Sequence, residues 1–186
     1  EINFPLDHPQ YLGTFPNLLS KAQDKIKNHD LVISIGTNVF DGFFYMRGQL
    51  FNNDTFHAHI DSSASTIGRN EKTDLGIISD PKSALIDLNL ELNKKMDGEI
   101  KEKISLRKKE IQIQTVAIKK EEKNTINENY NQNPMSAHRM FSEIFKSISN
   151  YIVIDDSVSS RQALLTANKF KPGEMHGERG GAIGWG

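Results

Sequence analysis

Residues 150–186 read NYIVIDDSVSSRQALLTANKFKPGEMHGERGGAIGWG. The apolar run at 151–154 predicts a strand, and the acidic, hydroxyl-rich residues 155–160 predict a turn that leads into a helix. Serine hydroxyls and the unpaired N–H groups at the start of a helix favour an anion, and a diphosphate is the anion we expect. Five glycines among the ten residues from Gly177 to Gly186 indicate backbone close to a flat or large group, because glycine has no Cβ to keep that group away.

The composition is that of an ordinary globular protein. In 186 residues, 23 lysines and arginines nearly balance 24 aspartates and glutamates, so the net field typical of nucleic-acid or membrane binding is missing. The lack of cysteine excludes disulfides and thiolate chemistry and is compatible with a reducing compartment, so we expect a cytoplasmic protein. No apolar run reaches the roughly 18 residues of a membrane span. Because the chain starts at Glu1 and stops inside the glycine segment, we expect a fragment.

Strand and helix patterns alternate upstream of this stretch. Strand patterns cover 31–35, 56–60 and 73–79, and the apolar run at 31–35 predicts a strand buried on both faces of a parallel sheet. The alternation predicts an α/β fold, with a Rossmann-like parallel-sheet domain over 1–123 and the start of a second α/β domain over 135–186. The polar residues 124–134 predict a linker between the two domains.

Helix signals separate these strands. After Asn17, the residues Leu18, Ala22 and Ile26 fall four apart and mark one helix face. Asp80 and Pro81 predict the start of the next helix, with aspartate as its cap. The buried face expected for that helix consists of Ala84, Leu85, Leu88, Leu92 and Met96. The charged run 99–122 predicts a solvated helix, and a further helix is expected after a cap at Ser136.

Two features of the first half suggest other ligands. The strand pattern at 31–35, followed by a second strand that ends in Asp61, resembles a dinucleotide-binding unit. The closely spaced glycines of such a unit are missing, because the next glycine after Gly36 is Gly42. His57 and His59 alternate on one strand and face the same side, which suits a metal ion. We favour histidines on the sheet surface, because Asp61 is their only nearby carboxylate.

The second half contains two further groups of polar residues. His176, Glu178 and Arg179 could act on a substrate as acid, base or anion clamp, and charges of a solvent-facing loop are the equal alternative. The serines of the turn lack a nucleophile-elbow pattern, so phosphate contact or helix capping is favoured for them. No Gly-Lys-Ser or Gly-Lys-Thr occurs, which argues against a nucleotide-triphosphatase phosphate loop.

Two motifs of the last segment, IDDSVSSRQALL and HGERGGAIGWG, resemble the start of the cofactor-binding domain of thiamine diphosphate-dependent decarboxylases and synthases. That group includes benzoylformate decarboxylase and acetolactate synthase. The upstream segments LVISIGTNVFDGFFY, FHAHIDSSASTIGRN and DLGIISDPKSALIDL resemble the central domain of the same enzymes. The resemblance covers nearly the whole chain in the family's order. It implies a central domain followed by the first strand–helix unit of the thiamine diphosphate-binding domain.

The resemblance also implies a cofactor site. The family's diphosphate-contacting segment falls on Asp156, Ser157, Val158 and Ser159. The backbone beside the aminopyrimidine ring falls on Gly180, Gly181, Ala182 and Ile183. In the family, a carbonyl at the place of Gly181 accepts from the exocyclic amine, and a bulky side chain at the place of Ile183 bends the cofactor. Bending brings the amine next to the thiazolium carbon that loses its proton.

Other parts of the family's site have no counterpart in this sequence. The activating glutamate belongs to an N-terminal domain, and the Gly-Asp-Gly motif that binds Mg²⁺ belongs beyond Gly186. No histidine stands near Phe43, where benzoylformate decarboxylase has a catalytic one, which argues against benzoylformate as the substrate.

We therefore expect part of a decarboxylase (a lyase) or carboligase that uses thiamine diphosphate and Mg²⁺ on a 2-oxo acid and is inactive as this chain alone. The resemblance implies a homodimer or homotetramer, and no nucleic acid or membrane partner is expected. A non-catalytic nucleotide- or flavin-binding α/β module is the alternative. A structural domain that binds a partner through the charged helix is a third possibility.

Overall fold

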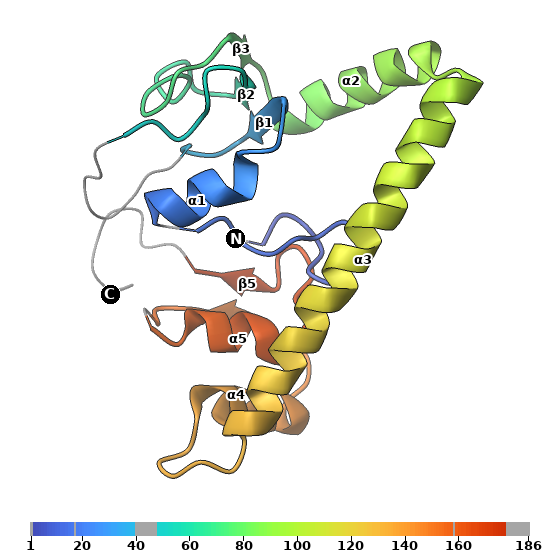
Figure 1. Ribbon diagram of the computed structural model, residues 1–186. Coiled ribbons are helices and arrows are strands. Elements are labelled where there is room, and N and C mark those ends of the chain that lie inside the picture. Colours follow the sequence, from blue (N-terminus) through green and yellow to red (C-terminus); the bar gives the residue numbers. More distant parts are fainter. Residues whose placement is uncertain (1, 17, 40–47, 158, 178–186) are drawn as a thin grey trace. The chain divides into compact units, whose positions relative to one another are not determined.

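The computed structural model describes residues 2–16, 18–39, 48–157 and 159–177 (Figure 1). The chain divides into two compact units. One unit consists of Thr14–Ile100, and the other combines Glu1–Gly13 with Lys101–Gly186. The predicted domain boundaries around 124–134 remain a prediction.

The unit Thr14–Ile100 is built on a three-stranded parallel sheet. Strands β1 (Leu31–Ile35), β2 (Phe56–Asp61) and β3 (Leu75–Ile78) lie in the order β1-β2-β3, with helix α1 (Leu19–Ile26) before them and α2 (Pro81–Lys95) after them (Figure 1). The predicted α/β class with parallel strands is confirmed.

Helix α1 supplies most of this unit's apolar core. Ala22 and Ile26 are buried as predicted, but Leu18 is 54% exposed and the neighbouring Leu19 takes the buried place. These side chains pack with Leu50, and partly buried Val32, Val39 and Phe51 surround them. The helix therefore starts one residue later than its apolar spacing predicted, and Leu18 becomes its cap residue.

The two faces of the sheet differ, which corrects the expectation that β1 is buried on both. The strand register places Leu31 beside Phe56, and Ala58 between Ile33 and Leu75. Ile60 is 4% exposed on this face, but five other large apolar side chains are between 37% and 48% exposed: Leu31, Ile33, Phe56, Leu75 and Ile77. Coverage differs between the strands, since Phe56 is the one exposed residue of the middle strand β2, whereas the edge strand β3 is exposed throughout.

Helix α2 starts where the sequence predicted. The Asp80 carboxylate accepts a hydrogen bond from the Ser83 N–H at 2.9 Å, with Pro81 as the first helical residue. The predicted buried face is wrong, because no α2 residue is buried and both Leu85 and Leu92 are exposed. The helix therefore packs on little of the sheet.

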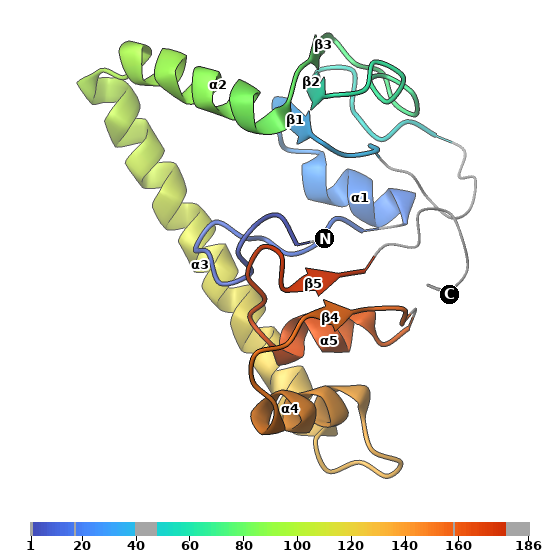
Figure 2. The ribbon, with the colours of Figure 1, turned by 180° about the vertical axis from the view of Figure 1, so that it is seen from behind.

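The unit formed by Glu1–Gly13 and Lys101–Gly186 has a smaller parallel pair, β4 (Val153–Ile154) and β5 (Met175–His176). Helices α4 (Ala137–Ser147) and α5 (Arg161–Ala167) accompany it, and Figure 2 shows α5 beside β4. The buried core consists of Leu6, Leu164, Phe170 and Met175. Ser136 caps α4 as predicted, accepting from the Arg139 N–H at 3.2 Å.

The N-terminal residues belong to this second core rather than to the three-stranded sheet. Leu6 is one of its buried members, and the Ile2 N–H donates to the Met175 carbonyl at 3.2 Å. The Thr115 hydroxyl on α3 (Gly98–Asn129) lies 2.9 Å from the Pro9 carbonyl and donates to it. Backbone, core and side-chain contacts thus all tie residues 2–13 to the unit that contains β4 and β5.

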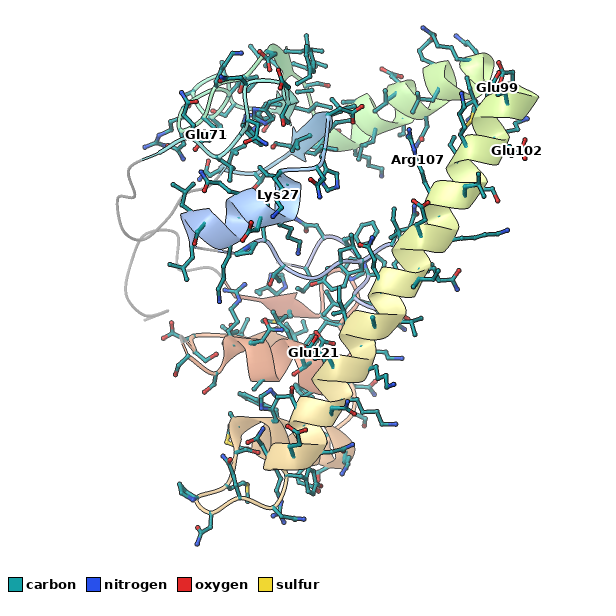
Figure 3. The ribbon with its side chains drawn as sticks, viewed as in Figure 1. Lys27, Glu71, Glu99, Glu102, Arg107 and Glu121 are labelled. Atoms are coloured by element: carbon teal, nitrogen blue, oxygen red, sulfur yellow. The ribbon has the colours of Figure 1, made fainter. Side chains whose placement is uncertain are left out.

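Helix α3 is a solvated helix with charged side chains along its length, among them Glu102, Arg107 and Glu121 (Figure 3). It extends to Asn129, so the first six residues of the predicted linker 124–134 are helical. Within this stretch the Thr125 hydroxyl donates to the Glu121 carbonyl and the Asn129 amide donates to the Thr125 carbonyl, four residues earlier in each case, so these polar side chains bond within the helix. No helix within the described ranges has the length and apolar character that crossing a membrane requires.

Candidate functional site

The turn between β4 and α5 is organised by a buried aspartate. The Asp155 side chain is 2% exposed, and its Oδ1 accepts from the Ser157 N–H at 2.9 Å and from the Ser157 hydroxyl at 2.5 Å. The Asp155 N–H donates to the His176 carbonyl at 2.8 Å, which continues the pairing of β4 with β5. The carboxylate therefore fixes the backbone of the turn at the point where the strand ends.

Arg161 connects this turn to the residue after β5. Its Nε lies 3.7 Å from Asp155 Oδ2, and its Nη1 donates to the Gly177 carbonyl. Gly177 also fits closely against the aspartate, because a Cβ there would lie 3.1 Å from Asp155 Cβ and 3.2 Å from Oδ2. The end of β5 and the start of α5 thus meet around one carboxylate.

The structure describes three of the eight residues in the predicted cofactor-binding set. Asp156 and Ser159 are exposed at the turn, and Ser157 is half-buried because both of its donors go to Asp155. The other predicted residues lie outside the described part of the chain: Val158, Gly180, Gly181, Ala182 and Ile183. Of the polar cluster expected near the glycines, His176 lies on β5, whereas Glu178 and Arg179 also fall outside the described residues.

Sequence reasoning missed Asp155 and Arg161 as organisers of this site. The two residues are six positions apart and meet only because β5 returns Gly177 to the end of β4. β5 has two residues, too few for an alternating pattern. The sequence feature that could have indicated β5 is the apolar Met175, which stands in an otherwise polar run after Gly173.

His57 and His59 are buried, which corrects their expected place on the sheet surface. Each is 1% exposed, and their ring centroids are 5.7 Å apart. Residues that flank β2 cover this face, since the Phe51 ring lies 4.4 Å from the His57 ring and the Lys72 carbonyl lies 2.8 Å from its Nδ1. Among the described residues, no group of three or more histidine, aspartate and glutamate side chains is placed to hold a metal ion.

The hydrogen bonds of His57 define which ring nitrogen carries the proton in its neutral form. Because the Lys72 carbonyl can only accept, Nδ1 carries the proton, and Nε2 accepts from the Ser34 hydroxyl at 2.9 Å. Burial lowers the pKa of His57, and the Lys72 carbonyl and the Asp74 carboxylate oppose this shift. The pair is therefore a hydrogen-bonded part of the core.

Comparison with protein families identifies the first half of the chain. Residues 2–88 match the family model described as thiamine pyrophosphate enzyme, central domain. Over these residues the chain is similar to a thiamine pyrophosphate enzyme central domain. The match includes β1, β2, β3 and the start of α2, the elements whose sequences resembled this family.

A solved structure extends the similarity to the rest of the fold. Over 94% of its length, the chain is similar to the thiamine diphosphate-dependent 4-hydroxybenzoylformate decarboxylase of Rhodococcus jostii RHA1, with a TM-score of 0.59 and 12% sequence identity. The chain spans 30% of the length of that protein. No curated protein matches in sequence. The likeness of fold thus includes the unit that contains the Asp155 turn.

Proposed function

We propose that this chain is part of an enzyme that uses thiamine diphosphate and Mg²⁺ to cleave or form a carbon–carbon bond of a 2-oxo acid. The observation that carries the proposal is the ordered turn at the end of β4, in a chain whose residues 2–88 match a thiamine pyrophosphate enzyme central domain. The diphosphate would lie at Asp156, Ser157, Val158 and Ser159. The aminopyrimidine ring would lie along Gly180, Gly181, Ala182 and Ile183.

The donors of the turn suit a diphosphate. Ser159 is exposed at the turn, so its hydroxyl is available to a phosphate oxygen. Ser157 has another role, because its N–H and hydroxyl donate to Asp155 and shape the turn. α5 has only seven residues, so its dipole is given little weight.

The bound cofactor would supply the carbanion that attacks the carbonyl carbon of the substrate. The residues of this chain would bind and orient it. Asp155 holds the turn in one conformation before the cofactor arrives, which lowers the ordering cost of binding. The complete enzyme is proposed to be a cytoplasmic homodimer or homotetramer, and the 186-residue chain alone is expected to be inactive.

The test uses the complete gene product that contains these residues. Thiamine diphosphate with Mg²⁺ should raise its melting temperature and support carbon dioxide release from at least one of a panel of aromatic and aliphatic 2-oxo acids. Analysis of the products separates the two reactions, because decarboxylation yields an aldehyde and carboligation yields a 2-hydroxy ketone or 2-hydroxy acid.

A serine variant tests the place of the diphosphate. Ser159→Ala should raise the cofactor concentration for half-maximal activity by about tenfold, the effect of losing one hydrogen bond to a charged group. Ser147→Ala, on α4 and away from the turn, is the matched control and should change nothing. A protein that gains neither stability nor activity from thiamine diphosphate would contradict the proposal. Bound flavin or adenine nucleotide would support a binding module instead.

A further inference from the structure

The contacts of Arg161 extend beyond the turn in which it lies. Its Nε pairs with the buried Asp155 carboxylate, and its Nη1 donates to the Gly177 carbonyl, sixteen residues along the chain. One planar guanidinium therefore touches both sides of the site, the turn after β4 and the first residue after β5. Arginine suits such a bridge because its N–H groups are held in a rigid fork.

We propose that Arg161 is a positioning residue that holds the start of the glycine segment in a fixed place relative to the diphosphate turn. The inference rests on the proposed function, in which these two segments bind opposite ends of one cofactor. Gly177 is the last described residue before the predicted glycine segment, so fixing its carbonyl fixes the point from which that segment starts.

Close packing at Gly177 supports the same role. An added Cβ would lie 3.1 Å from Asp155 Cβ and 3.3 Å from Met175 Cε, so a side chain here would crowd the carboxylate unless its neighbours moved by a few tenths of an ångström. The approach is what brings the Gly177 carbonyl within reach of Arg161. Backbone pairing from Asp155 to His176 at 2.8 Å adds a second connection, one that does not involve the arginine.

The size of the effect is limited by solvent. Arg161 is 38% exposed, so its ion pair with Asp155 is partly screened, and the hydrogen bond to Gly177 carries most of the expected contribution. Loss of that bond corresponds to a change of about threefold to tenfold in the equilibrium for local opening around Gly177. The remaining pairing of β4 with β5 should keep the unit folded.

The experiment compares Arg161→Gln and Arg161→Lys with the wild type in the complete gene product. Hydrogen–deuterium exchange of peptides that cover 174–180, measured without cofactor, should be about threefold to tenfold faster in Arg161→Gln. The apparent affinity for thiamine diphosphate should fall by a similar factor, while kcat at saturating cofactor stays within about twofold of the wild type. Lys169→Gln removes an exposed cation from the same unit and should change neither measurement.

Arg161→Lys separates positioning from charge. A single ammonium cannot reproduce the fork between Asp155 and Gly177, so this variant should remain closer to Arg161→Gln than to the wild type. Unchanged exchange at 174–180, full recovery by lysine, or a general loss of stability would each overturn the proposal. The exchange measurement needs no cofactor, so failure of the wild type to bind thiamine diphosphate would contradict the proposed function and leave the test of Arg161 intact.

Discussion

The hydrogen bond between Ser34 and His57 should make a measurable contribution to the stability of the three-stranded sheet. Ser34 on β1 is 9% exposed and His57 on β2 is 1% exposed, and their side chains meet at 2.9 Å. Three variants test the pair: Ser34→Ala, His57→Leu and the double variant. Each single change leaves a buried polar atom without its partner, whereas the double change removes both atoms.

The expected magnitudes come from the groups that lose partners. Ser34→Ala leaves Nε2 of His57 unpaired, which should lower the free energy of unfolding by about 1–3 kcal/mol. His57→Leu leaves both the Ser34 hydroxyl and the Lys72 carbonyl unpaired, so about 2–5 kcal/mol is expected. In the double variant the hydroxyl is also gone, and the total should fall short of the sum by about 1–2 kcal/mol.

The assay is urea unfolding followed by circular dichroism, with hydrogen exchange read on peptides from β1 and β2. The exchange data assign the loss to the unit Thr14–Ile100, because the other unit should keep the exchange rates of the wild type. Additive effects, equal to the sum within about 0.5 kcal/mol, would refute the reasoning, since the two side chains would then stabilise the sheet independently.

Acid should weaken the same unit. Burial lowers the pKa of His57 in the folded state, so the unfolded chain binds more protons, and the free energy of unfolding should fall as the pH drops below about 6.5. Urea midpoints at pH 7.5 and 5.5 measure this loss of stability. His57→Leu should reduce the difference between the two midpoints. Leu50→Ala should cost the unit Thr14–Ile100 about 2–5 kcal/mol, and Phe170→Ala should cost the other unit about 3–5 kcal/mol. Exchange that rises in both units for either variant would contradict the division into two cores. Asp80→Ala should lower the helix content of α2 in circular dichroism, whereas the exposed Asp87→Ala should not.

Local signals in the sequence placed the main elements well. The strand of Phe56–Asp61 and the start of α2 at Pro81 follow from short-range patterns, a β-rich run and an Asp-Pro start signal. Such patterns depend on residues that are near one another in the sequence, and these residues are also near one another in a helix or strand. The family resemblance was carried by the same segments.

Burial and the contacts of the turn depended on residues distant in sequence. His57 and His59 could not be placed in a core from alternation alone, because residues 50–51 and 71–74 cover them. Leu85 and Leu92 of α2 have helical spacing and still remain exposed, since spacing does not say whether another surface is present. Arg161 was missed because one of its partners is a backbone carbonyl, which leaves no trace in residue type.

The assignment of residues 2–13 to the unit that contains the Asp155 turn affects how this fold can be divided. Leu6 belongs to the same core as Leu164 and Phe170, although the whole of Thr14–Ile100 separates them in the gene. A single cut in the coding sequence cannot release that unit intact, and transplanting it into a related enzyme requires two junctions. A gene exchange with one crossover near residue 100 would combine residues 2–13 of one protein with the core of another. Leu6 would then pack against side chains from the other protein, although it lies far in sequence from the junction.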